Sequence, residues 1–427
     1  MESSVLPHSK ATAARADVLV VGGGVVGIAC ALELARRGAA VTVLERDRLG
    51  HGCSYGNAGW LTPSLAVPLP APGLLWQAAK WLLDAESPFY IQPRLDFGLA
   101  IWLLRFLAAT GRRRFERGTA ALVALCRWSV DAWAELAARS SEPFGFQRTG
   151  LLAVYEHERA FAAGRANAEL VARHGVPFEV WSAADVAARE ASIVGRQVGA
   201  YYFPRDAHCE PYLAVRALAG EAARAGARFV ESAEVYDVEL AGGRARRLLT
   251  TAGDFVGEQV VVATGAWSKR FGARLGLRLP VLGAKGYSLV VPRSAGYPTR
   301  SLMLAERKLA LNPHADSLRI SGTLELVDED LSITRRRVEA IVRAARGMIR
   351  LPDPLPPHEL WRGLRPCTPD GMPMIGRARG LANVWLATGH QMTGLKTAPG
   401  TGRLLAELMT GEAPTFDSAP FRADRYG

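Results

Sequence analysis

The sequence predicts an α/β fold that opens with a strand–helix–strand unit, and three observations support this prediction. A continuous apolar run, Val18–Val21, is typical of a parallel strand that is buried on both faces. Glycines in a GxGxxG pattern follow, and they open a helical stretch that continues through Arg37 and stops at Gly38. A second apolar run, Val41–Leu44, then ends at the acidic residue Glu45. This order of elements predicts a Rossmann-like domain.

The three glycines of the pattern have separate tasks in such a unit. Gly22 makes the tight turn, Gly24 lets a pyrophosphate approach the backbone, and Gly27 lets the helix pack closely on the sheet. The helix N-terminus directs free N–H groups and positive potential at the phosphates, so Val25 and Val26 are expected to contact them. The pattern therefore predicts a dinucleotide-binding site.

The acidic end of the second strand strengthens this interpretation. Glu45 is placed to accept hydrogen bonds from both ribose hydroxyls of an adenosine, and Arg46 follows it at the same edge. This unit alone does not distinguish FAD from NAD.

Three further segments favour FAD over NAD. Residues 53–64, CSYGNAGWLTPS, are small, turn-forming and suited to wrapping a long ligand. Residues 260–268, VVVATGAWS, read as a buried strand followed by a close backbone approach. Residues 384–411 read as a strand, a Gly-rich loop and a helix whose N-terminus favours the negative charge of a reduced flavin. The further candidate cofactor-binding residues are Ser54, Asn57, Ala58, Gly59, Val235, Ala263, Thr264, Gly265, Gly389, Gly394, Leu395 and Lys396.

The bulk composition indicates an ordinary globular enzyme of two domains. The chain has 427 residues, is 49% hydrophobic, and has a net charge of +11 that is scattered rather than gathered in a long basic block. No nucleic-acid partner is therefore expected. The five cysteines form no CxxC pair, which argues against a disulfide framework and a metal site. No run of eighteen apolar residues and no secretion signal is present, so a cytoplasmic location is expected.

Several motifs together resemble the D-amino-acid oxidase superfamily of flavoproteins, above all the bacterial D-amino-acid dehydrogenases and the D-hydroxyproline dehydrogenases. They are VVGGGVVG, SYGNAGWLTPS, the PLPAPG turn (68–73), KGYSL (285–289), WRGLRPCTPDGMPMIG (361–376) and the ATGH…APGTGRLLAELMTG segment. The resemblance implies a discontinuous FAD-binding domain with an inserted α+β substrate domain, mainly an antiparallel sheet. The expected division is a disordered tail at 1–15, an FAD-binding domain at 16–62, 205–275 and 364–427, and a substrate domain at 63–204 and 276–363.

The resemblance also implies roles for three residues. Arg365 occupies the position that pairs with a substrate carboxylate, and a planar guanidinium suits a bidentate carboxylate contact; the alternative is a structural arginine that binds backbone carbonyls. Tyr287 is expected to line the substrate cavity or, alternatively, to be a core tyrosine. His390 is expected to bind the cofactor or substrate, or to be a structural donor. Residues 361–376 are rich in Pro and Gly and are expected to form a shaped loop. Cys367 lies at a different spacing from the covalent attachment site of some relatives, so non-covalent FAD is expected.

The implied reaction is FAD-dependent oxidative deamination of D-amino acids. A hydride would pass from Cα to flavin N5, and the imino acid would give a 2-oxo acid and ammonia. A dehydrogenase of D-proline or cis-4-hydroxy-D-proline, which forms a cyclic imine, and a glycine- or sarcosine-type oxidase are alternatives. A tRNA-modifying flavoprotein and a membrane-docked electron-transfer subunit are further alternatives. The flavin would be reoxidised by a quinone or electron-transfer chain, or by O2.

Two apolar segments bear on a possible membrane contact. Residues 73–86 and 97–110 are apolar and contain Trp, and the second leads into Arg112–Arg114. They are expected to be buried helices of the substrate domain or, alternatively, a basic amphipathic surface that attaches to the inner face of the cell membrane.

Overall fold

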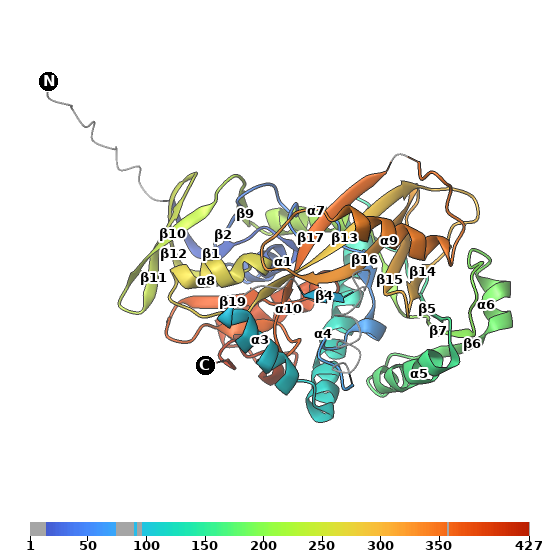
Figure 1. The fold of residues 1–427 in the computed structure, drawn as a ribbon. Coiled ribbons are helices and arrows are strands. Elements are labelled where there is room, and N and C mark those ends of the chain that lie inside the picture. The colour runs from blue at the N-terminus through green and yellow to red at the C-terminus, as the bar shows by residue number, and fades with distance from the viewer. Residues whose placement is uncertain (1–13, 74–88, 92–95, 357, 427) are drawn as a thin grey trace, which may run out of the picture.

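The computed structural model describes residues 14–73, 89–91, 96–356 and 358–426, which fold around two large sheets (Figure 1). The first sheet is mainly parallel and the second mainly antiparallel. In Figure 1 the first sheet lies to the left with α8 and the second lies to the right with α9. The fold is therefore of the α/β class, as the sequence predicts.

The first sheet gathers strands from three distant parts of the chain. Its parallel strands lie in the order β19, β12, β1, β2 and β9, and β18 runs antiparallel beside β19. A hairpin of β10 and β11 extends the first half of β12. The strands are β1 (Ala14–Val21), β2 (Val41–Leu44), β9 (Arg228–Val230), β10 (Val235–Ala241), β11 (Arg244–Thr250), β12 (Gly253–Val262), β18 (Met374–Arg377) and β19 (Val384–Thr388).

The central parallel strands end level with one another. Val21 pairs with Val262 of β12 on one side and with Leu44 of β2 on the other. Helix α1 (Val25–Ala35) starts just beyond this edge, and its chain turns at Gly38 with φ 85°. The carboxyl ends of parallel strands are where ligands bind in open α/β sheets. This edge is therefore the expected location of a site.

Alternate residues of the first sheet face two different hydrophobic layers. One face packs against α1, α4, α7 and α10, and the other against α8 and the β10–β11 hairpin. Helices α1 and α10 approach closely because residue 402 is glycine: a Cβ on Gly402 would lie 2.4 Å from the carbonyl oxygen of Ala29. The helices are α4 (Arg112–Arg139), α7 (Pro211–Arg224), α8 (Ser268–Arg274) and α10 (Gly394–Thr410), with short 3-10 turns at Pro63–Leu65, Gly265–Trp267 and Ala419–Phe421.

The second sheet has the order β17, β13, β16, β15, β14, β5, β7 and β6, with β4 beside the end of β16. Helix α9 covers one face and α3 covers part of the other. The elements are α3 (Phe97–Ala108), α5 (Glu158–Ala172), α6 (Ala183–Arg189), α9 (Arg335–Arg346), β3 (Trp60–Leu61), β4 (Phe89–Ile91), β5 (Leu151–Tyr155), β6 (Glu179–Ser182), β7 (Gly199–Phe203), β8 (Ala207–His208), β13 (Leu282–Pro292), β14 (Ser301–Leu304), β15 (Leu309–Pro313), β16 (Ser317–Leu326) and β17 (Glu359–Cys367).

One local expectation is wrong: the first half of the stretch 361–376 is not a loop. Residues 359–367 form β17, which pairs antiparallel with β13, and the turn comes only after Cys367. Strand β17 lies at the edge of the sheet and has a neighbouring strand on one side only. Pro366 is tolerated there because an edge strand does not need every backbone N–H for pairing.

The division into an FAD-binding domain and a substrate domain stays a prediction. Two of its predicted boundaries, at residues 15/16 and 363/364, fall within strands. Strand β1 begins at Ala14, and β17 runs across residue 364. Residues 74–86 of the predicted apolar segment lie outside the described residues.

Candidate active site

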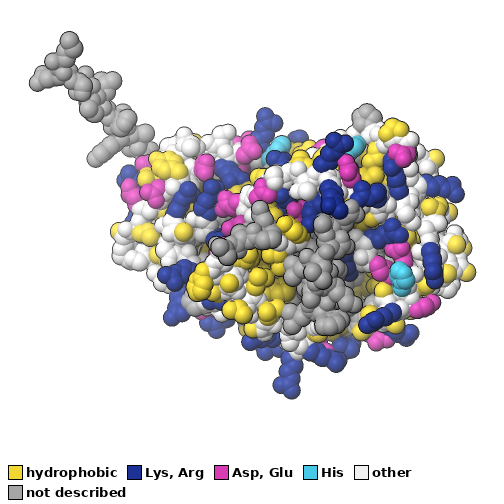
Figure 2. Space-filling view, in the orientation of Figure 1, with side chains coloured by type: hydrophobic (Ala, Val, Ile, Leu, Met, Phe, Trp, Pro, Cys, Tyr) yellow, Lys and Arg dark blue, Asp and Glu magenta, His cyan; other side chains and the backbone are white. Residues whose placement is uncertain are grey.

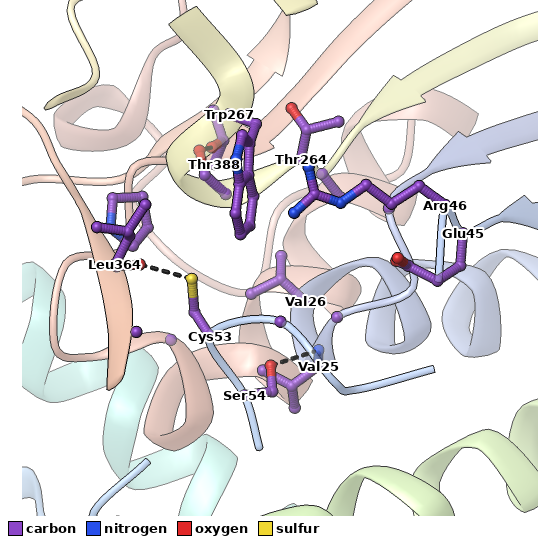
Figure 3. Close-up of a pocket in the computed structure, with 18 of the residues that line it drawn as sticks. Val25, Val26, Glu45, Arg46, Cys53, Ser54, Thr264, Trp267, Leu364 and Thr388 are labelled. Atoms are coloured by element: carbon purple, nitrogen blue, oxygen red, sulfur yellow. Dashed lines mark hydrogen bonds between the residues drawn. The ribbon is translucent and has the colours of Figure 1, made fainter. Parts of the chain in front are cut away.

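A cavity of about 370 Å³ lies at the carboxyl edge of the parallel sheet (Figure 3). It runs from the ends of β1, β2 and β12 to the start of α10 and one side of β17. The structure brings to it these predicted residues: Gly22, Gly24, Val25, Val26, Glu45, Arg46, Ser54, Asn57, Val235, Ala263, Thr264, Gly265, His390, Gly394 and Leu395.

The glycine turn has the tight geometry that the sequence pattern requires. Gly22 has φ 111°, and a Cβ there would lie 2.6 Å from the carbonyl oxygen of Ala263. A Cβ on Gly27 would lie 2.0 Å from the carbonyl oxygen of Gly22, so this glycine serves packing and does not line the cavity. Gly24 faces open space apart from the Ser54 hydroxyl, to which a Cβ would be 3.5 Å. The turn thus leaves a cradle at the helix N-terminus.

The start of α1 offers backbone donors to this cradle. The N–H of Val25 donates to Oγ of Ser54 at 3.1 Å, which Figure 3 shows as a dashed line. The hydroxyl of Ser54 therefore marks the place of an acceptor at the helix N-terminus, which is the place that a phosphate oxygen takes in dinucleotide sites.

The acidic residue after β2 lies at the other end of the cradle. Oε2 of Glu45 accepts from the N–H of Gly23 at 2.6 Å and Oε1 accepts from the N–H of Asp47 at 3.1 Å. Burial raises the pKa of Glu45, although these two hydrogen bonds act in the opposite direction. The guanidinium of Arg46 lies over the Trp267 ring, 3.8 Å from its centroid. Figure 3 shows both side chains beside the cavity. A carboxylate and a flat cation–aromatic pair suit a ribose and a base.

The far end of the cavity is formed by β17 and by the loop before α10. Cys53 donates from its thiol to the carbonyl oxygen of Leu364 at 2.5 Å, which ties the loop after β2 to β17. Nε2 of His390 is 3.1 Å from Oγ1 of Thr401. Burial lowers the pKa of His390 to about 3, so its imidazole is neutral near pH 7. Helix α10 begins at Gly394 and directs its N-terminus at this end.

Four other predicted cofactor-binding residues lie beside the cavity without lining it. A Cβ on Gly59 would lie 2.2 Å from the carbonyl oxygen of Cys209, so this glycine allows the backbone to pass β8. The carbonyl of Ala58 accepts from Nδ2 of Asn312. Gly389 turns the backbone with φ 80°. Lys396 is buried, and its Nζ donates to Oγ1 of Thr62 at 2.6 Å.

Arg365 does not line the cavity, although strand alternation places it on the same face of β17 as Trp361, which does. Its guanidinium lies flat over Gly286 of β13: a Cβ there would be 2.1 Å from Nη1. Nη1 donates to the carbonyl oxygen of Thr323 at 2.9 Å. Among the described residues, no carboxylate lies within 4.0 Å of this guanidinium. Burial of the guanidinium lowers the pKa of Arg365. This half-buried cation therefore has no acidic partner in the described part of the chain.

The structure does not bring Tyr287 to Arg365 or to the cavity. Successive side chains of a strand point to opposite faces, and Gly286, beneath Arg365, is the residue before Tyr287. Tyr287 is 1% exposed within the core beneath α9, and its hydroxyl accepts from the N–H of Thr334 at 3.1 Å.

Sequence reasoning missed several residues that line the cavity. Trp267, Arg270 and Arg274 follow β12 on the 3-10 turn and α8, and Arg274 donates to the carbonyl oxygen of Val235 at 2.8 Å. The motif VVVATGAWS indicates a ligand near this segment, but nothing in its sequence distinguishes Trp267 from a core tryptophan. Trp361 and Gln391 also line the far end.

The described residues meet neither the requirements of a metal site nor those of a membrane-spanning helix. No three His, Cys, Asp or Glu side chains in the described ranges come together in a way that could hold a metal ion. No helix within these ranges is both long and apolar enough to cross a membrane.

The residues present fit FAD. The glycine cradle and the α1 N-terminus suit a pyrophosphate, Glu45 suits the ribose, and the far end beside the α10 N-terminus is left for the flavin ring. The cavity reaches all three places in one continuous space.

Comparisons with known proteins agree with this fit. The model of the DAO family, FAD dependent oxidoreductase, matches residues 17–408. A D-amino acid dehydrogenase of Cereibacter sphaeroides is 32% identical over 96% of this chain and 95% of its own length. One from Bradyrhizobium diazoefficiens is 30% identical over 96% and 98%. The structure of a glycine oxidase from Geobacillus kaustophilus superposes with a TM-score of 0.77 at 26% identity, over 96% of this chain and 99% of that one.

The family model covers most of the chain, and the relatives match it nearly end to end. The glycine cradle, the acidic residue after β2 and the cavity that joins them to α10 are the parts that an FAD site needs. The chain therefore belongs to the DAO family of FAD-dependent oxidoreductases.

Proposed function

We propose that this protein oxidises D-amino acids with FAD. The Cα–H bond of the substrate would break, its hydrogen would pass with both electrons to FAD, and the amine nitrogen would lose a proton to solvent, which gives an imino acid and reduced FAD. Water would then convert the imino acid to a 2-oxo acid and ammonia. The names of the relatives that match nearly the whole chain support this substrate class. The single structural observation behind it is the half-buried Arg365 that has no carboxylate partner among the described residues.

Arg365 is the group that would bind the substrate carboxylate. A guanidinium offers a planar fork that matches a carboxylate in two hydrogen bonds, whereas one backbone carbonyl uses only part of its donors. The pKa of Arg365 is lowered from 12.5, yet an arginine remains charged at neutral pH. The cation would therefore fix the end of the substrate opposite to its side chain.

His390 is proposed to position groups rather than to transfer a proton. Its pKa of about 3 makes it a weak base near neutral pH, and Thr401 holds one of its ring nitrogens. FAD, when bound, supplies the two-electron acceptor that the oxidation needs. The residues of the protein would hold the two reactants in place.

An anaerobic mixing experiment tests the proposal. The purified holoenzyme would be mixed with D- and L-amino acids, glycine, sarcosine, D-proline and cis-4-hydroxy-D-proline, and the loss of flavin absorbance followed. Rapid bleaching by acyclic D-isomers alone supports the proposed substrate class. Fastest bleaching by a cyclic D-imino acid, or by glycine or sarcosine, would assign the protein to that class instead.

Replacing Arg365 tests the role of this residue. Arg365→Leu is expected to raise KM sharply and to reduce kcat/KM by about 3–5 kcal/mol, which is typical of removing one partner of a buried charge pair. Arg293→Leu is the matched control, because Nη1 of Arg293 also donates to a backbone carbonyl, that of His314, at 2.6 Å. Steady-state kinetics that change equally little in both variants would exclude Arg365 as the carboxylate anchor.

We propose further that the electron acceptor is reached at a membrane surface. Helix α3 is buried on one side, where Nε1 of Trp102 donates to the carbonyl oxygen of Pro280. Its other side exposes Phe97 by 82% and Leu104 by 65%, together with Ile101 and Leu107. Figure 2 shows hydrophobic side chains gathered over α3, with Lys and Arg side chains below them.

The charges beside α3 favour an anionic lipid surface as the partner. Arg105 and Arg112–Arg114 are exposed next to the apolar stripe. An apolar helix face with a basic border binds in the headgroup region of anionic bilayers. A quinone dissolved in that bilayer would then be within reach of the enzyme as the oxidant of its reduced flavin.

A further inference from the structure

Gln391 combines three features that are unusual for a glutamine. Its backbone has φ 50°, in the left-handed region that residues other than glycine avoid. It is 8% exposed, and its Nε2 amide has no hydrogen-bond partner within the described part of the chain. It lines the far end of the cavity, beside His390 and opposite β17. A strained backbone and a buried donor without a partner both cost stability.

The backbone around Gln391 explains how this strained conformation is held. The N–H of Gln391 donates to the carbonyl oxygen of Pro366 at 2.9 Å, and His390 forms a bridge with Cys367. On the other side, the N–H and Oγ1 of Thr393 both donate to the carbonyl oxygen of His390. The turn between β19 and α10 is thus fixed to β17 at one end and capped at the other. It therefore presents the Gln391 side chain to the cavity and not to solvent, whereas Met392 is 46% exposed.

The unpartnered atom indicates what kind of ligand atom would satisfy it. Nε2 of an amide is a donor only, so its partner must be an acceptor. Glu45 fixes the nucleotide end of the cavity, which leaves the end at Gln391 for the flavin ring. The pyrimidine part of that ring carries carbonyl oxygens. These acceptors gain electron density on reduction, so a donor stabilises the reduced ring more than the oxidised ring.

We propose that Gln391 is a positioning residue that donates a hydrogen bond from Nε2 to a carbonyl oxygen of the flavin ring. The bond holds the ring in the cavity and raises its reduction potential. This inference depends on the binding of FAD and not on the proposed D-amino-acid substrate. A glycine at position 391 would adopt this φ without strain, but it would have no side-chain amide to donate. The hydrogen bond therefore explains why a strained glutamine occupies this position.

Two variants separate hydrogen bonding from backbone strain. Gln391→Leu keeps the strain and removes the donor, whereas Gln391→Gly removes both. Lys308→Gly is the matched control, since Lys308 has φ 54° in the exposed turn between β14 and β15, outside the cavity. The holoenzymes would be compared by FAD release on dilution, by dye-equilibrated redox titration and by thermal unfolding after FAD removal.

The expected pattern differs between the variants. Both Gln391 variants are expected to bind FAD about threefold to tenfold more weakly, the effect of one lost hydrogen bond. Their midpoint potentials should fall by about 15–30 mV, which is the same fold range for a two-electron couple. The FAD-free proteins with Gln391→Gly and Lys308→Gly should unfold at a higher temperature, and Lys308→Gly should leave FAD release and potential unchanged.

The opposite pattern would overturn the inference. If both Gln391 variants release FAD at the wild-type rate and keep the wild-type potential, the amide makes no contact with the cofactor. A change in Gln391→Gly alone would assign the effect to the backbone of the turn and would equally exclude the hydrogen bond. None of these measurements uses a substrate, so they stand whether or not D-amino acids bleach the flavin.

Discussion

Arg365 and Gly286 form a pair in which one residue requires the other to be small. The guanidinium lies where a side chain of residue 286 would begin, 2.1 Å from an ideal Cβ. Even a methyl group on β13 therefore has to displace the guanidinium from its position over the sheet. The bond from Nη1 to the carbonyl oxygen of Thr323 fixes the direction in which the remaining donors point.

Gly286→Ala is accordingly expected to raise KM for the amino acid by tenfold or more while leaving FAD binding intact. A misplacement of about 1 Å in a binding group can cost on the order of a hundredfold in rate. Steady-state kinetics would measure the effect, and flavin content would check the cofactor. Gly111→Ala is the control, because a Cβ at Gly111 would meet no atom within 4 Å. A wild-type KM in Gly286→Ala would show that Arg365 does not bind the substrate.

Three buried histidines predict how stability depends on pH. Burial lowers the pKa of His208 to about 4 and those of His314 and His390 to about 3. The unfolded protein takes up protons on these residues below about pH 6.5, whereas the folded protein leaves them neutral. The free energy of unfolding should therefore fall as the pH falls from about 6.5 to about 4, by about 1.4 kcal/mol per pH unit for each proton.

His390→Asn should reduce this slope by one proton, because asparagine remains neutral in both states. Denaturant unfolding at several pH values between 6.5 and 5 measures the slope before most carboxylates titrate. His157→Asn is the comparison, since the side chain of His157 is 68% exposed. An unchanged slope in His390→Asn would mean that His390 is already charged in the folded protein.

At the scale of elements, α3 has apolar residues around most of its circumference. Asp96 caps its start by accepting from the N–H groups of Gly98 and Leu99. One side packs on β13 and β16, and the other exposes a second apolar stripe. A helix that is apolar all round is buried or meets a membrane. Among the described residues, 97–108 thus form a helix that is buried on one side only, so the two sequence-based alternatives for this segment, a buried helix and a membrane-facing surface, each describe one of its sides.

The exposed stripe of α3 predicts binding to lipid vesicles. The double substitution Phe97→Ser, Leu104→Ser should reduce binding to anionic vesicles at least a hundredfold, because each side chain contributes about 1.5–3 kcal/mol when buried. Arg113→Glu should weaken binding to anionic vesicles more than to neutral ones, and added salt should reduce that difference. Co-sedimentation measures both effects.

Leu213→Ser is the control for the vesicle experiment, since Leu213 is 41% exposed on α7. Equal loss in the control, or no vesicle binding by the wild-type holoenzyme, would contradict membrane docking through α3. Substrate-dependent bleaching of the flavin in solution would not be affected by either result.

At the scale of the whole molecule, the sequence predicts the part of the site that comes from one continuous segment. It does not predict the parts that sheet pairing brings together from distant segments. Gly22 to Glu45 form one strand–helix–strand unit whose geometry depends on local turns and packing, so the pattern predicts it directly. Trp267 and Arg274 reach the cavity only because β12 pairs with β1. Tyr287 was expected to line the substrate cavity or to be a core tyrosine, and strand alternation directs it into the core beneath α9.

The strand β17 shows the same limit in its local structure. Pro366 and the glycines before it are typical of loops, and only pairing with β13 at the end of the sheet makes them extended. The positive φ of Gln391 and its amide, which has no partner among the described residues, depend on the turn that joins β19 to α10. Such features arise from contacts between distant segments and leave no periodic signal in the sequence.

The gathering of distant strands into the first sheet has a consequence during synthesis on the ribosome. Strand β1 and helix α1 emerge early, but β12 follows much later, and β19 and α10 later still. Until then the nascent polypeptide has the phosphate cradle without the neighbouring strands and helix that close the cavity. The apolar strands β1 and β2 therefore stay without β12 and β19 as neighbours while most of the second sheet is translated. Chaperone binding to translating ribosomes should be prolonged over this interval, and the flavin should join the protein only after α10 has left the exit tunnel.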